Sequence, residues 1–177
     1  MSRQFWDEAL FWATADGTAI HTTTTETIIF PDVTIPANYM QDGRVLRMRA
    51  YGKLSTTGTP TITFAIRWGG VSGTILANTE AITCASGAAN TAWSIEAYIQ
   101  TRTNGSSGVL MVMGDVTVNL TASTQTSQTF GVSGFDAPAQ VTANLTADTA
   151  LSLTADWSAN SSSNTLTGML YTLEALN

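Results

Sequence analysis

Alternating apolar and polar residues between Gly43 and Gly70 constrain the fold of this chain more than any other feature. Side chains of a β-strand point alternately to its two faces, so alternation separates a buried face from an exposed one. In the first half of the segment the apolar face holds Leu46, Met48, Ala50 and Leu54, and the opposite face holds Arg47, Arg49, Tyr51 and Lys53. In the second half the apolar face holds Ile62, Phe64, Ile66 and Trp68. With the polar loop 55–60 between them, the two halves predict a β-hairpin with one apolar face.

The rest of the chain repeats this pattern in short segments separated by turn residues. We expect strands over 27–30, 71–77, 80–84, 93–102, 109–120, 141–146, 149–157 and 165–175, and a short one near Phe130 within a loop at 121–140. Gly114 is expected to mark a bulge. Trp68, Trp93 and Trp157 lie on apolar faces and are predicted to be buried. About eight to ten short strands predict an all-β antiparallel β-sandwich, most specifically a jelly roll.

The N-terminal segment departs from this pattern. Phe5, Ala9 and Trp12 have the spacing of one helical face, so residues 2–13 fit a short helix, and they fit an extended arm equally well. We therefore expect an N-terminal arm or extension over 1–27 and a sandwich domain over 28–177. Trp6 and Trp12 are candidates for contact with another chain, because they lie outside the main strand pattern.

Composition excludes several classes of protein. The net charge of −6 argues against general nucleic-acid binding, which requires a basic surface. No apolar run approaches the roughly 20 residues that span a bilayer, so no membrane association is expected. Asp7 and Glu8 interrupt the position of a signal-peptide core, which favours a protein that is made in the cytoplasm and used without Sec-type export. The single cysteine, Cys84, excludes an intrachain disulfide and is expected to be a buried, unreactive thiol.

Residues for catalysis are sparse. His21 is the only histidine, and a nucleophilic triad would have to use it; a surface or capping role is the more common one for such a residue. One histidine and one cysteine cannot build a zinc site. Glu96 and Asp115 lie in predicted strands and are candidates for a general-acid pair, but exposed strand positions are the commoner explanation. We therefore expect no enzymatic activity, no cofactor and no metal.

Five of the seven basic residues lie between Gly43 and Gly70, and they have two interpretations. They are either a solvated strand face paired with nearby carboxylates or an interface for an acidic partner, a role in which arginine and tyrosine are favoured. The candidate interface residues, including the N-terminal aromatics, are Phe5, Trp6, Trp12, Arg44, Arg47, Arg49, Tyr51 and Lys53.

Three stretches resemble a group of structural proteins of tailed bacteriophages and prophages: GRVLRMRAYGKLSTTGTPTITFAIRWGGVSGTIL, TRTNGSSGVLMVMG and TADTALSLTADWSANSSSNTLTGMLYTLEALN. The resemblance covers roughly residues 28–177 and implies a virion component without catalytic residues. Size and all-β character are similar to jelly-roll capsid decoration, or cement, proteins, which implies a homotrimer on the outer capsid surface with the major capsid protein as partner. The alternative is a tail or fibre-associated module that binds host glycans or protein, and a third possibility, a glycan depolymerase, requires a carboxylate pair in a groove.

Overall fold

The computed structural model describes residues 7–121, 123–131 and 140–176, and every regular element among them is a strand. The strands are β1 (Glu8–Trp12), β2 (Thr27–Ile28), β3 (Val33–Ile35), β4 (Val45–Ser55), β5 (Thr61–Trp68), β6 (Thr74–Asn78), β7 (Ile82–Thr83), β8 (Thr91–Thr103), β9 (Gly108–Asn119), β10 (Gln125–Phe130), β11 (Gln140–Ala143), β12 (Thr149–Trp157) and β13 (Thr165–Ala175). The part of the chain that the structure describes contains no helical segment of the length and hydrophobicity needed to cross a bilayer.

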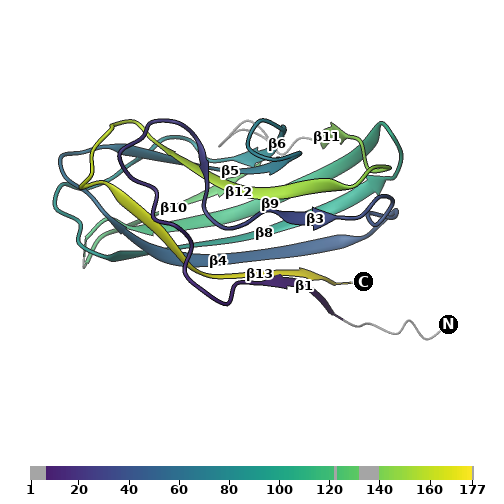
Figure 1. Ribbon diagram of the computed structural model, residues 1–177, viewed down its shortest axis with the longest axis horizontal. Coiled ribbons are helices and arrows are strands. Elements are labelled where there is room, and N and C mark those ends of the chain that lie inside the picture. The colour runs from purple at the N-terminus through teal and green to yellow at the C-terminus, as the bar shows by residue number, and fades with distance from the viewer. Residues whose placement is uncertain (1–6, 122, 132–139, 177) are drawn as a thin grey trace.

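These strands form two antiparallel sheets that pack face to face (Figure 1). The larger sheet has the order β1-β13-β4-β8-β9, and both β10 and β11 pair with the far edge of β9. In the smaller sheet β12 and β5 are central, with β2 and β3 beside β12 and with β6 and β7 beside β5. The predicted all-β antiparallel sandwich is therefore confirmed.

The pairing order identifies the sandwich as a jelly roll. Strands from the two ends of the chain pair with each other in order. β1 pairs with β13, β2 and β3 pair with β12, β4 pairs with β8, and β5 pairs with β6. The pattern is that of a long antiparallel ribbon with two arms, one from each half of the chain. The ribbon is rolled up so that successive strand pairs belong alternately to the larger and the smaller sheet. Strands β9, β10 and β11 are inserted between β8 and β12, and they widen the larger sheet beyond that scheme.

The predicted hairpin between Gly43 and Gly70 is wrong, although both of its strands exist. β4 pairs with β13 and β8 in the larger sheet, whereas β5 pairs with β12 and β6 in the smaller one. Each strand has an apolar face that must be buried, and crossing to the opposite sheet at 55–60 lets the two faces meet across the core. Contact between the two sheets is shown by Phe64 of β5 and Trp93 of β8, the strand beside β4, whose ring centroids are 5.4 Å apart.

The core follows the alternation in the sequence. Trp93 and Trp157 are each 2% exposed and Trp68 is 6% exposed, which confirms the prediction that they are buried. Gly114 is not a bulge, because β9 pairs regularly through it. A Cβ atom there would lie 2.8 Å from the Cβ of Ala97, so this glycine permits close approach of two strands.

The N-terminal segment forms a strand, and the helical alternative is wrong for residues 8–12. β1 pairs with the second half of β13, and the chain continues along β13 through hydrogen bonds from Ala13 N to Tyr171 O and from Gly17 N to Gly168 O, both 2.8 Å. The strand places Phe11 on the inner face against Tyr171 and turns Trp12 outward. β1 is thus an edge strand of the larger sheet; residues 1–6 of the expected arm lie outside the described residues.

Candidate binding face on the larger sheet

The outer face of the larger sheet collects most of the predicted interface residues. Arg47, Arg49, Tyr51 and Lys53 alternate with the buried residues of β4 and therefore lie on this face. Trp12 joins them, because the register links it through Thr172 to Arg49. Arg44 does not, since it precedes β4 and its guanidinium lies 4.3 Å from the centre of the Tyr39 ring. Phe5 and Trp6 lie outside the described residues.

Exposed aromatic rings are the most unusual feature of this face. Trp12 is 60% exposed, and Tyr51 and Tyr98 are 42% exposed. Tyr98 is paired with Arg47, four residues along β4 from Tyr51, so the two tyrosines are about 14 Å apart at the usual strand dimensions. Tyr98 was not among the predicted interface residues. The signal that could have identified it is its place on the face of β8 that alternates with the apolar residues.

Two of the arginines on the face are paired with a carboxylate of the same chain. Arg47 donates from Nε to Glu174 Oε2 at 2.9 Å, and Arg49 Nη2 lies 3.2 Å from the same oxygen. The hydrogen bond from Arg47 holds the pKa of Glu174 below its ordinary value. The basic stripe of β4, which we define as Arg47, Arg49 and Lys53, is therefore partly neutralised by a carboxylate of the same chain, as the first of its two interpretations predicts. Its contact with another molecule stays a prediction.

Glu96 and Asp115 are directly opposite each other on β8 and β9. Glu96 Oε1 accepts a hydrogen bond of 2.9 Å from the Tyr98 hydroxyl, and Asp115 Oδ1 accepts one of 2.7 Å from the Thr129 hydroxyl. Both carboxylates are exposed on the outer side of the sheet, where they serve as hydrogen-bond acceptors. His21 is likewise exposed, with Nδ1 2.8 Å from Thr22 Oγ1. Within the described ranges no cluster of His, Cys, Asp or Glu is arranged to hold a metal ion.

Two neighbouring hollows lie at one end of the face, and Tyr51 lines the first of them. The first, of about 260 Å³, is lined by Tyr51, Gly52, Ala92, Trp93, Ser94, Thr117 and Asn119. The second, of about 400 Å³, is lined by Gly87, Ala88, Ala89, Asn90, Thr91, Asn119 and Thr121. Asn119 borders both, and we refer to the two neighbouring hollows, which extend from β4 to the loop that precedes β8, as the concave strip.

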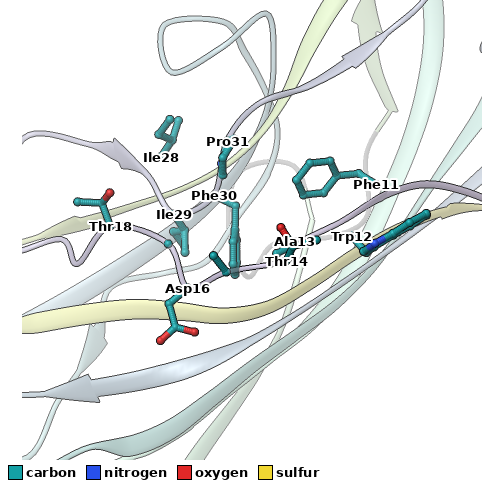
Figure 2. A pocket seen from close by; sticks show the side chains of 12 residues that line it. Phe11, Trp12, Ala13, Thr14, Asp16, Thr18, Ile28, Ile29, Phe30 and Pro31 are labelled. Atoms are coloured by element: carbon teal, nitrogen blue, oxygen red, sulfur yellow. The ribbon is translucent and has the colours of Figure 1, made fainter.

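A groove of a different kind lies where the edges of the two sheets meet. It has a volume of about 390 Å³ and lies between segments 11–18 and 28–31. Figure 2 shows the Phe11 ring turned toward Pro31 and Phe30, whereas the Trp12 ring and the Asp16 carboxylate point away from them. Phe30 in turn stacks on Tyr171 with a centroid separation of 5.0 Å, so the floor of the groove is continuous with the core.

Comparison with known proteins gives one structural similarity. No protein-family profile and no curated protein matches the chain. Among solved structures it is similar to the CBM2 module of the evolved Dit of Lactobacillus casei BL23 phage J-1, with 12% sequence identity, a TM-score of 0.40, and coverage of 99% of this chain and 98% of that chain. A likeness of this extent carries no argument about function, and the jelly-roll assignment rests on the strand order alone.

Proposed function

We propose that this chain is a structural component of a bacteriophage virion, and that it acts by binding through the outer face of the larger sheet rather than by catalysis. The blocks STTGTPT…RWGG and LTADWSA…SNT support the virion assignment through their resemblance to phage structural proteins. The observation that carries the binding assignment is the exposure of Trp12, Tyr51 and Tyr98 on one face. Exposed aromatic residues gathered on a surface are typical of a recognition site.

Within the virion, we propose that the protein is a recognition module that contacts the host surface. A basic face that docks onto an acidic capsid requires free cations, but Arg47 and Arg49 share Glu174. Rim charges that are already paired contribute little to a new contact. The exposed rings provide contact area without the need to break an existing ion pair. This favours the tail or fibre-associated role over head decoration.

Binding of the purified protein to cells of the bacterium that the virion infects tests this proposal. Replacing both Trp12 and Tyr98 with Ala is expected to weaken binding at least about tenfold, because each truncated anchor residue typically costs more than about 1 kcal/mol. Ile75→Ala is the matched control, since Ile75 is 37% exposed but belongs to the smaller sheet. Absence of cell binding by the wild-type protein would refute the recognition role.

Head decoration is the second candidate, and the position of β1 favours it. β1 is the edge strand of the larger sheet, and such an edge can accept a strand or arm from a neighbouring subunit, as in a homotrimer on the major capsid protein. Quantitative mass spectrometry of purified particles separates the two roles. Hundreds of copies per particle and binding to emptied heads would support decoration, whereas a few copies located on the tail would support recognition.

A further inference from the structure

We propose that the concave strip beside Tyr51 binds an uncharged carbohydrate chain. One sugar ring would lie against the Tyr51 ring in the first hollow, and the chain would continue past Asn119 into the second. The inference rests on the proposed function in one respect, namely that the outer face of the larger sheet is the binding surface. It adds the location of the subsite and the chemical class of the ligand.

The register of three strands builds the first hollow. Tyr51, Ser94 and Thr117 are aligned across β4, β8 and β9 and thus share one row of the outer face. The row extends about 10 Å from Tyr51 to Thr117 at the usual strand spacing. Ser94 and Thr117 have short side chains, so the larger Tyr51 side chain lies beside a low floor that carries hydroxyl groups.

The chemistry of the lining points to the ligand. None of the described residues that line either hollow is charged, although carboxylates and guanidinium groups lie on the same face. The polar groups are the hydroxyls of Ser and Thr and the side-chain amides of Asn90 and Asn119, which both donate and accept hydrogen bonds. Sugars combine many hydroxyl groups with an apolar ring face that packs on an aromatic ring. An uncharged carbohydrate thus matches the site, whereas a strongly charged ligand would find no counter-charge in it.

The second hollow is held in place before any ligand arrives. Its loop is attached to the end of β4 by hydrogen bonds from Thr56 N to Ala88 O (2.9 Å), from Gly87 N to Thr56 O (3.0 Å) and from Asn90 N to Ser55 Oγ (3.0 Å). A preformed site loses less conformational entropy on binding.

Polysaccharide extracted from the surface of the host cells is the probe for the test, with affinity measured by titration calorimetry. Tyr51→Ala is expected to reduce the affinity at least about tenfold, the usual effect of truncating an aromatic anchor. Tyr51→Phe keeps the ring and should retain the affinity. Asn119→Ala should weaken binding several-fold, whereas Ile75→Ala should leave it unchanged. Equal affinity of wild-type protein and Tyr51→Ala, with both variants folded by circular dichroism, would overturn the proposed subsite.

Treated cells separate failure of this inference from failure of the proposed function. Periodate, which cleaves vicinal diols of sugars, should abolish binding of the wild-type protein to the cells, and protease treatment should not. Loss of binding after protease, with no effect of periodate and no affinity for the extracted polysaccharide, would show a protein receptor and refute the inference while the recognition role stands. Absence of any cell binding would refute both.

Discussion

Replacing Glu26 with Gln tests the contact that ties the segment before β2 to the outer face of the smaller sheet. Arg67 on β5 donates from Nε to Glu26 Oε1 at 2.6 Å and from Nη2 to Oε2 at 2.5 Å, and the Thr154 hydroxyl also donates to Oε1. The Arg67 and Glu26 side chains are only 16% and 22% exposed. Glutamine keeps the shape of the side chain but removes its charge. It also keeps only one acceptor oxygen, so one of the two hydrogen bonds from Arg67 to residue 26 is lost, while the bond from Arg67 to Gly73 O at 2.9 Å remains.

The expected loss lies between two limits. Breaking a fully buried ion pair costs about 3–5 kcal/mol, and a hydrogen bond to a charged group contributes about 1.5–3 kcal/mol. Because this pair is mostly but not completely buried, we expect a decrease of about 2–3 kcal/mol in the free energy of unfolding at neutral pH. For a domain of this size that decrease lowers the Tm by about 5–10 °C.

The effect should depend on pH. Burial raises the pKa of Glu26, but the hydrogen bonds from Arg67 and Thr154 outweigh it and hold the pKa below its ordinary value of 4.5. A carboxyl group whose pKa is lower in the folded state stabilises the fold above its ordinary pKa, and that stabilisation is lost as the pH falls through the folded-state pKa. The Tm difference between wild-type protein and Glu26→Gln should therefore be largest near neutral pH and should shrink in acid.

Asp156 provides the matched control, because it lies on the neighbouring strand β12 and its pKa shifts the other way. Burial, together with the charge of Glu26, raises the pKa of Asp156. Its ionised form is thus disfavoured in the folded state, so Asp156→Asn should preserve or raise the Tm at neutral pH. Thermal unfolding followed by circular dichroism across the acid and neutral range measures both variants. Equal losses in the two, or a loss in Glu26→Gln that does not change with pH, would refute the reasoning.

Three further predictions concern other parts of the fold. Gly168→Ala should lower the Tm by about 3–10 °C in a thermal melt, because the new Cβ would lie 2.3 Å from Phe30 Cζ and overpacking costs about 1–3 kcal/mol. Cys84 should be unreactive toward a thiol reagent at pH 8 until the protein is denatured, since burial raises its pKa to about 11. Glu174→Gln should destabilise the protein by about 1 kcal/mol in urea unfolding, because it removes the negative charge that Arg47 and Arg49 share.

Local pattern predicted the strands well, and it could not predict their partners. Alternation located β4 and β5 within two residues of their observed ends, because burial on one face determines which residues alternate. A short polar connection suggested a hairpin, yet the same pattern arises when consecutive strands face each other from opposite sheets. The choice depends on which distant strands supply hydrogen bonds, here β13 and β12, and no local signal encodes that.

The N-terminus and the candidate site show the same limit. Residues 8–12 are too few to distinguish a helical spacing from a strand, and pairing with β13 decides between them. The basic stripe on β4 was visible in the sequence, but its partner Glu174 is 127 residues from Arg47. Tyr98 was equally visible as a single outward aromatic residue. Its relation to Tyr51 became apparent only through the register of β4 and β8.

The inserted strands explain why this jelly roll has a binding strip at all. In a jelly roll without the inserted strands, the larger sheet would end at β8. The row of outer-face residues that begins at Tyr51 would then end at Ser94, on an open edge. β9 extends the row and contributes Thr117 and Asn119, the two residues that close the first hollow and join it to the second. The insertion thus places polar residues on the outer face, and its inner face adds Leu110, Val112, Val116 and Val118 to the core. Removing β9 would therefore disturb the core as well as the proposed subsite, whereas substitutions on its outer face change the strip alone, which is why function must be argued from this strip and not from the fold.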